Sequence, residues 1–428
     1  MRRWFSIIWI LLLMVSVVFS QEKSSKEKAL EEFKNEHYTQ AIDWLEKALK
    51  ESPQDAEIYY YLGWFNHYRA YDSRPLGGYD YSYSEQIFNY LDKALELNPD
   101  YGDAKYFYGA ECSGNAFIAM QNNDADKLKY YYQLAYQKGA YPDWLIEFGK
   151  NILMNCEENA ILFTGGNADF DICSYLQLCQ NFRNDVTVIP IGNIDRPWYV
   201  SFLKNGLKNC VRSVSISLTE HQIMDIHPFK WKSTEVAISV SSGDKLKFGL
   251  PEDYHMAWTV DPDLTSERMH SKIEGEEAKK RTYLSPQRAV LLQIVEDNFD
   301  KRPIFFSNFA SPIFYGGLED HFQNRGLVSQ LLPIKTQDSD YVYDASAIEK
   351  LIDSGNLSRY KTIKNNDFPR ISGIVISGYS SAFLNLAEVY RKSDRKNELN
   401  KLIELYKKCI IIDFKPDYEQ MVLDQLEQ

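Results

Sequence analysis

The sequence lacks the short motifs that mark most catalytic and cofactor sites. Its six cysteines include no Cys-x-x-Cys pair, which argues against a zinc ribbon or a thioredoxin-type redox site. It contains no Gly-x-Gly-x-x-Gly or P-loop pattern, so no dinucleotide or nucleoside triphosphate site is indicated. A Gly-x-Ser-x-Gly hydrolase elbow is also missing. We therefore expect no cofactor, no metal and no catalytic residue that the sequence can assign, and enzymatic activity stays undecided.

Basic residues are outnumbered. The chain has 48 Lys and Arg against 60 Asp and Glu, and its formal net charge is −12. Nucleic acids and anionic lipid surfaces both attract basic proteins. The composition thus argues against a nucleic-acid partner and against general adhesion to membranes.

Long apolar runs are scarce, and one stands at the N-terminus. Arg2 and Arg3 precede an apolar run from Trp4 to Phe19, which is short for a membrane span of about 20 residues. Small residues at the end of this run suit a signal peptidase, with Gln21 as the first mature residue. We expect residues 1–20 to be a signal peptide and the mature protein to be exported to the periplasm or its envelope face, without a membrane span. An uncleaved anchor is the alternative.

A repeat occupies the N-terminal third. The segment 44–49, followed by Pro53, recurs imperfectly as 90–95 followed by Pro99, a displacement of 46 residues. The tetratricopeptide period is about 34 residues, so the displacement equals one period plus an insertion of about 12. Small, aromatic and proline positions in 29–53 resemble the tetratricopeptide family. The resemblance implies helical hairpins over residues 21–150 that hold a protein partner in the cell envelope.

The insertion, near residues 70–84, carries four tyrosine rings. These candidate partner-binding residues are Tyr71, Tyr79, Tyr81 and Tyr83. Insertions in repeat arrays often project from the binding face, so the rings could clamp a peptide or a sugar. The alternative is a loop whose rings pack against the array.

The pattern changes near residue 151. Short apolar runs bounded by turn residues predict strands at 160–164, 186–191, 303–307 and 327–334. Helical segments separate them, so residues 151–340 are expected to form an α/β domain with a mostly parallel sheet. Further strands are expected at 213–218 and 236–240, a short helix at 318–324 and an irregular excursion at 242–282. Residues 341–428 are expected to form a C-terminal helical segment with one repeat-like hairpin at 381–411, so the fold class is α plus α/β.

One polar cluster follows the first predicted strand of this domain. Its tentative ligand-binding residues are Thr164, Gly165, Gly166, Asn167, Asp169 and Asp171. Ligands of open α/β sheets bind at the carboxyl ends of strands. Two carboxylates oppose a phosphate there and suit a hydroxyl-rich ligand or a cation better. The alternative is that the glycines make a turn and an aspartate caps the following helix.

Three segments of the middle domain resemble a known family. They are 159–166 running into 175–177, 183–188 running to Trp198-Tyr199, and 301–306 running to 317–327. Over roughly residues 155–335 they are similar to the soluble C-terminal region of a bacterial domain-of-unknown-function family. Its members are membrane proteins whose membrane part is similar to protein O-mannosyltransferases.

Two departures from that family limit what the resemblance implies. The family usually has Asp-Asn-Asp after the two glycines, whereas this sequence has Asn167-Ala168-Asp169, so only Asp169 matches. The membrane-spanning part has no counterpart in this sequence. Any transferase activity of that part is therefore not carried over.

Two further groups of polar residues have weaker patterns. His221, Asp225 and His227 match no regular metal-binding spacing, so surface or capping roles are favoured. Glu319 and Asp320, beside His321, fit the start of a helix better than a glycosidase pair.

The function expected from the sequence is that of an exported, non-enzymatic protein-binding or scaffold protein. The alternative is an accessory subunit or degenerate enzyme of envelope glycan transfer that binds a sugar near residues 165–171. A hydrolase that uses scattered carboxylates is the third hypothesis.

Overall fold

A computed structural model describes residues 23–72, 79–208, 210–263, 283–337, 339–353, 355–363, 368–411 and 415–428. The chain divides into two compact units, unit 1 (Met1–Glu111) and unit 2 (Cys112–Gln428). The domain boundaries expected from the sequence stay predictions. The expected signal peptide (1–20) and the side chain of Tyr71 lie outside what is described. Within the described ranges, no helix combines the length and the apolar character that a membrane span requires.

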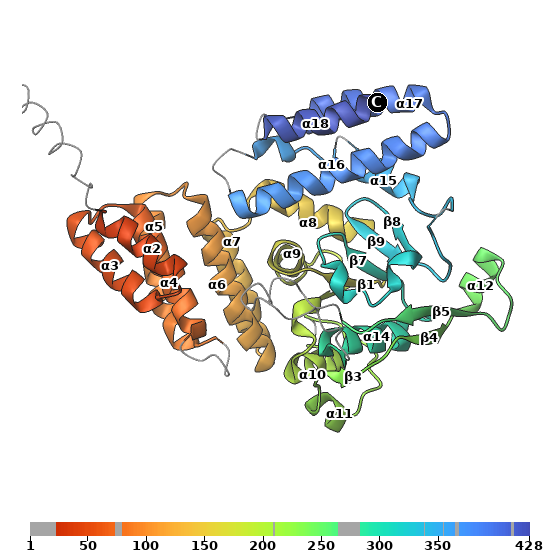
Figure 1. The fold of residues 1–428 in the computed structure, drawn as a ribbon, viewed down its shortest axis with the longest axis horizontal. Helices are drawn as coiled ribbons and strands as arrows, with labels where there is room; N and C mark the ends of the chain where they lie inside the picture. Colours follow the sequence, from red (N-terminus) through yellow and green to blue (C-terminus); the bar gives the residue numbers. More distant parts are fainter. Residues whose placement is uncertain are drawn as a thin grey trace, which may run out of the picture. The chain divides into compact units, whose positions relative to one another are not determined.

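Unit 1 consists of helices that pack in chain order, α2 on α3, α3 on α4 and α4 on α5 (Figure 1). Their bounds are α2 Ser25–Lys34, α3 Tyr38–Glu51, α4 Ala56–Asp72, a short 3-10 turn η1 Tyr81–Tyr83, α5 Ser84–Leu97 and the start of α6 Gly102–Gln121. The Ser24 side chain and Glu27 form a capping box that starts α2.

Small residues allow these helices to approach closely. Ala41 and Ala48 of α3 are buried, as the repeat pattern predicts. Gly63 of α4 faces α5, where an added Cβ would lie 3.0 Å from the Leu91 side chain. A larger residue at 63 would therefore require the Leu91 side chain to shift. The assignment of these hairpins to the tetratricopeptide family stays a prediction.

Unit 2 surrounds a five-stranded sheet. Its helices are the end of α6, α7 Ala125–Gln137, α8 Asp143–Asn155, α9 Ile172–Gln180, α10 Pro197–Asn205, α11 Glu220–Met224, α12 Ser242–Phe248, α14 Pro286–Asn298, α15 Ala345–Leu351, α16 Pro369–Lys392, α17 Lys396–Cys409 and α18 Pro416–Glu427. Its strands are β1 Ile161–Thr164, β2 Thr187–Pro190, β3 Phe229–Lys230, β4 Thr234–Ser239, β5 His255–Val260, β6 Tyr283–Leu284, β7 Ile304–Ser307, β8 Phe322–Asn324 and β9 Val328–Leu331.

The strand order in the main sheet is β2-β1-β7-β9-β8. β1 pairs in parallel with β2 and β7, whereas β9 pairs antiparallel with both β7 and β8. The sheet is therefore mixed: β1, β2, β7 and β8 run in one direction and β9 runs against them, so the expectation of a mostly parallel sheet is confirmed only in part. The reason is that β8 and β9 are joined by a short connection, which returns the chain antiparallel and places β9 between β7 and β8.

Other expectations for this region also need correction. Residues 213–218 run extended but form no ladder, because side chains hold their backbone. Asn298 Nδ2 donates to Ser215 O (2.8 Å) and Ser217 N donates to Asp297 Oδ2 (2.6 Å). The stretch 242–282, expected to be irregular, contains α12 and β5, and β5 pairs antiparallel with β4. Residues 318–324 form a 3-10 turn (η5, Leu318–His321) followed by β8 rather than one short helix.

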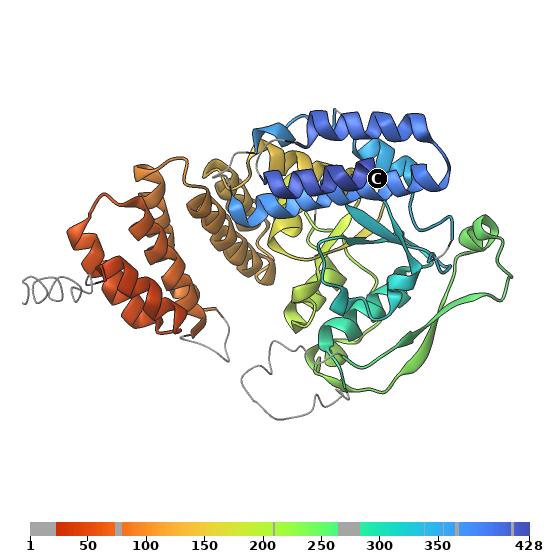
Figure 2. The ribbon, with the colours of Figure 1, turned by 45° about the horizontal axis from the view of Figure 1, so that its top comes forward.

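Helices cover both sides of the main sheet. α8 and α16 lie on one side, and α14 lies on the other, beneath the β4–β5 hairpin (Figures 1 and 2). α16, α17 and α18 pack on one another at the C-terminus (Figure 2). Two regions of unit 2 could hold a site. One is at the carboxyl ends of β1 and β7, and the other is between α14 and the β4–β5 hairpin.

Candidate functional site

The polar cluster predicted as a ligand site lies at the switch point of the sheet. β1 has β2 on one side and β7 on the other, so the chain reverses direction across the sheet between β1 and β7. Such a reversal usually opens a crevice at the carboxyl ends of the strands. Here Thr164 ends β1 and Ser307 ends β7, and both are fully buried.

The Gly165–Asp171 segment forms a tight turn around one carboxylate. Asp169 accepts the backbone N–H groups of Gly165 (2.9 Å), Gly166 (2.9 Å) and Phe170 (3.0 Å). Asp169 is also hydrogen-bonded to the Ser307 side chain. It is 1% exposed, and burial raises its pKa despite these bonds. The carboxylate thus holds its own turn together, the structural role that was the alternative interpretation.

The loop after β7 closes over this turn. A Cβ added to Gly165 would lie 2.4 Å from the carbonyl oxygen of Phe309. Backbone therefore packs directly on backbone on this side of Gly165, whereas Gly165 itself is exposed and an added Cβ at Gly166 would have no atom within 4 Å. Gly165 is required for this close approach.

Asp171 connects the turn to two helices. Its Oδ1 accepts Ser113 Oγ of α6 at 2.6 Å and the Tyr132 hydroxyl of α7 at 3.3 Å. The residue is 4% exposed, and burial raises its pKa to about 7. The side chain of Asn167 lies outside the described set. A ligand-binding role for Thr164–Asp171 stays a prediction, but both carboxylates already have internal partners.

The described tyrosines of the predicted clamp pack against unit 1. The Tyr79 hydroxyl donates to the buried carboxylate of Glu111 (2.8 Å). Tyr81 meets the Tyr79 ring edge-on at 4.8 Å between centroids. The guanidinium of Arg69 lies 4.8 Å from the centre of the Tyr83 ring. This geometry favours the alternative in which the rings support the array.

The remaining candidate groups form no metal site in the described ranges. His227 Nδ1 contacts the backbone oxygen of Asp225 (2.5 Å), and the two side chains are mostly exposed. His321 is buried, and burial lowers its pKa, while Glu319 and Asp320 begin η5 as expected. Asp225 and His227 are thus surface residues, whereas His321 is not.

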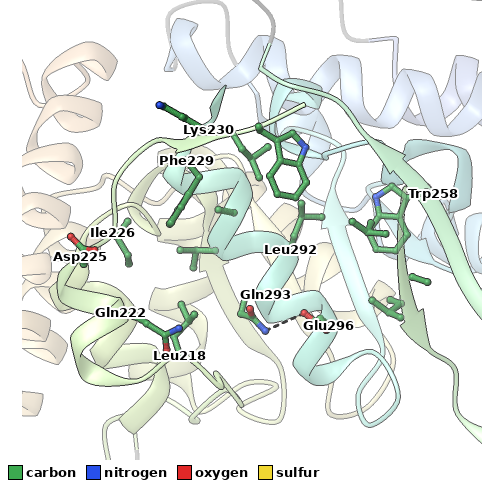
Figure 3. Close-up of a pocket in the computed structure, with 17 residues that line it drawn as sticks. Leu218, Gln222, Asp225, Ile226, Phe229, Lys230, Trp258, Leu292, Gln293 and Glu296 are labelled. Atoms are coloured by element: carbon green, nitrogen blue, oxygen red, sulfur yellow. Dashed lines mark hydrogen bonds between the residues drawn. The ribbon is translucent and has the colours of Figure 1, made fainter. Parts of the chain in front are cut away.

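A groove that the sequence did not predict lies along α14. Its cavity volume is about 690 Å³, in the range of small-molecule pockets. The floor is one stripe of α14, formed by residues spaced as i, i+3, i+4 and i+7: Ala289, Leu292, Gln293 and Glu296. The opposite stripe of this helix, which includes Leu291 and Ile294, is buried. Figure 3 shows Leu292 at the centre of the groove.

Two tryptophans border the groove with fixed orientation. Trp231 Nε1 donates to Val260 O at 2.9 Å, and Trp258 Nε1 donates to Gly316 O at 3.0 Å. Both indole N–H groups are thereby occupied, so the rings offer apolar faces. Phe229, on β3, adds a further ring that is 37% exposed. The groove can therefore bind apolar groups without first ordering its walls.

Charged groups of both signs reach the groove. The lining includes the acidic residues Asp225 and Glu296 and the basic residue Lys230, whose nitrogen points away from Leu292 (Figure 3). All three residues are exposed. Glu296 accepts a hydrogen bond from Gln293 Nε2 at 3.3 Å. The charged lining is net negative, which favours a ligand with a positive group.

Two patterns in the sequence are signals for this groove, although neither was part of the predicted sites. The helix over 286–298 has apolar residues on both faces, which indicates that something besides the sheet covers it. The alternation of buried Met256, Trp258 and Val260 in β5 also indicates a half-buried strand.

Unit 2 is thus an α/β fold with a mixed sheet, a tight turn at the switch point and a groove beside a separate hairpin. Residues 145–247 and 252–350 match the model of the family described as TMEM260-associated domain 2. This match covers the turn at 165–171 and the groove, and it falls where the sequence resembles a domain of unknown function. None of the curated proteins matches the chain.

Proposed function

We propose that the protein is an exported, non-enzymatic binding or scaffold protein of the periplasm or cell envelope. One observation carries this proposal: both carboxylates at the switch point have internal hydrogen-bond partners. Asp169 accepts three backbone N–H groups, and Gly165 packs on the Phe309 carbonyl. The position where α/β enzymes usually keep reactive groups free instead stabilises a turn.

Unit 1 supplies a surface suited to a protein partner. Phe33, Tyr38, Trp64 and Tyr68 form one aromatic cluster, with ring centroids 5.1 to 6.2 Å apart. Tyr68 is 38% exposed. Tyrosine and tryptophan commonly dominate the energy of protein interfaces because a large rigid ring is buried at small entropic cost.

The test is capture of envelope proteins by the purified mature chain. Tyr68→Ala should remove the captured partner without lowering the melting temperature of the bait. Tyr130→Ala is the matched control, because Tyr130 is a 58% exposed tyrosine of unit 2. Capture that both variants retain, or that both lose, would count against unit 1 as the binding surface.

A second candidate is an accessory subunit or degenerate enzyme of envelope glycan transfer. The match of residues 145–350 to TMEM260-associated domain 2 favours it, since the sequence resemblance for this region leads to relatives of O-mannosyltransferases. A sugar that binds near residues 165–171 of the folded chain should raise the melting temperature, and the increase should grow with the logarithm of sugar concentration above its Kd. Asn167→Ala, at a predicted ligand residue of the turn that includes the exposed Gly165, should abolish that shift. An unchanged shift would place the sugar elsewhere.

A further inference from the structure

The groove along α14 opens beside the edge of a strand. Val236, Ala237 and Ile238 are consecutive in β4, and all three line the groove. Neighbouring side chains of a strand point to opposite faces. Val236 and Ile238 lie on the same face of the hairpin as Trp258, the partner of Val236, whereas Ala237 lies on the other face. The groove therefore follows that face and also reaches Ala237 of β4.

That edge has no ladder in the described chain. β4 pairs with β5 in a two-stranded sheet, which uses one of its two edges. The lining from β5 is Trp258 alone, so the groove lies on the β4 side of the hairpin. An unpaired edge presents backbone N–H and C=O groups to an incoming strand.

We propose that this groove binds an extended segment of a partner protein, which adds to β4 as a third strand. The inference rests on the proposed binding function and names its second site. The segment pairs its backbone with β4 and places alternate apolar side chains over Ala289 and Leu292. A Lys or Arg of the segment faces Asp225 and Glu296. Backbone pairing provides affinity and the side-chain pockets provide sequence preference.

Charge complementarity selects this occupant. Two acidic residues and one basic residue line the groove, so a basic residue of the partner gains more than an acidic one. The indole rings of Trp231 and Trp258 are already held by hydrogen bonds. Apolar side chains of the segment therefore meet preformed walls.

The experiment uses a phage-displayed library of random dodecapeptides, selected on the purified mature chain. The expected winners alternate apolar residues and contain Lys or Arg. The most enriched sequence is then synthesised with a fluorescent label, and its binding is measured by anisotropy. No enrichment over an empty support, or enrichment of acidic or non-alternating sequences, overturns the proposal.

Two variants and one modified peptide separate strand addition from other modes. Glu296→Lys should weaken binding about fivefold, as expected when an exposed attractive pair becomes repulsive. Glu252→Lys, an exposed glutamate outside the groove lining, should leave binding within about twofold of the native chain. N-methylation of alternate peptide amides removes several hydrogen bonds and should cost at least about tenfold. Equal binding of the methylated peptide in both N-methylation registers refutes edge pairing.

The outcome is distinguishable from failure of the proposed function. If the peptide does not bind but Tyr68-dependent capture is intact, only the proposal for the groove is refuted. If the peptide binds but no partner is captured, the proposal for the groove stands and the proposal that unit 1 is the binding surface is refuted.

Discussion

Replacing Asp171 by Asn should stabilise the protein at neutral and alkaline pH. Asp171 is buried, and both of its donors, Ser113 Oγ and the Tyr132 hydroxyl, bond to the same oxygen, Oδ1. An asparagine keeps that oxygen and removes the ionisable group. Because burial of the charged form is what raises the pKa to about 7, Asn avoids the cost of that burial.

The direction in which the free energy of unfolding changes with pH follows from proton binding. Between pH 3.8, the ordinary value, and about 7, the unfolded chain releases the Asp171 proton while the folded chain keeps it. The free energy of unfolding therefore falls as pH rises through this window. Each pKa unit corresponds to about 1.4 kcal/mol, so a shift of about three units amounts to about 4 kcal/mol. Below the window this contribution is fully present, and above pH 7 it is lost.

Urea unfolding of the full chain, native and Asp171→Asn, at pH 4, 5, 6, 7 and 8 provides the assay. The free energy of unfolding of the variant should increase relative to that of the native chain as pH rises, by up to about 4 kcal/mol at pH 8. Ser113→Ala serves as a companion, since it removes a donor and should destabilise at every pH. A difference between native and Asn proteins that is flat across the series, or a variant that is less stable at pH 8, would refute the reasoning.

The other predictions concern the turn and the sheet. Gly165→Ala should lower the free energy of unfolding by about 2 kcal/mol because its Cβ meets the Phe309 carbonyl, whereas Gly192→Ala, with no atom within 4 Å, should be nearly neutral in the same denaturation assay. Asp169→Asn should lower the free energy of unfolding by about 2 kcal/mol, because the amide leaves one of the three backbone donors unpaired. Faster hydrogen exchange at residues 165–170 would show this loss. Arg302→Met should cost about 3 kcal/mol, because the guanidinium donates to Asn159 O and Ala160 O and to Thr187 Oγ1; equal melting temperatures would contradict it.

The sequence predicted well where one local pattern decides the outcome. The strands at 160–164, 186–191 and 303–307 are short apolar runs, and the structure places β1, β2 and β7 within them. The repeat with Ala41 and Ala48 likewise predicted buried small positions in α3. Each of these follows from the period of apolar residues, which depends on neighbours along the chain.

Expectations needed correction where the structure of a segment depends on the segments that pair with it. The apolar run in 327–334 predicts a strand but not its direction, and β9 runs antiparallel to β7. Residues 213–218 alternate like a strand, yet Asn298 and Asp297 take the place of a ladder. The groove depends on which stripe of α14 the β4–β5 hairpin leaves uncovered, and helical period alone does not decide that.

The sequence alone determined the acidic charge, the helical repeat and the alternation of strands and helices, because these depend on composition and on spacing along the chain. Only the tertiary structure decided that Asp169 accepts hydrogen bonds from its own turn, that Asp171 is buried against Ser113 and Tyr132, and that β4 borders a groove. Each of these depends on atoms distant in sequence that become neighbours when the chain folds, and burial then sets the cost of every unpaired charge and hydrogen-bonding group.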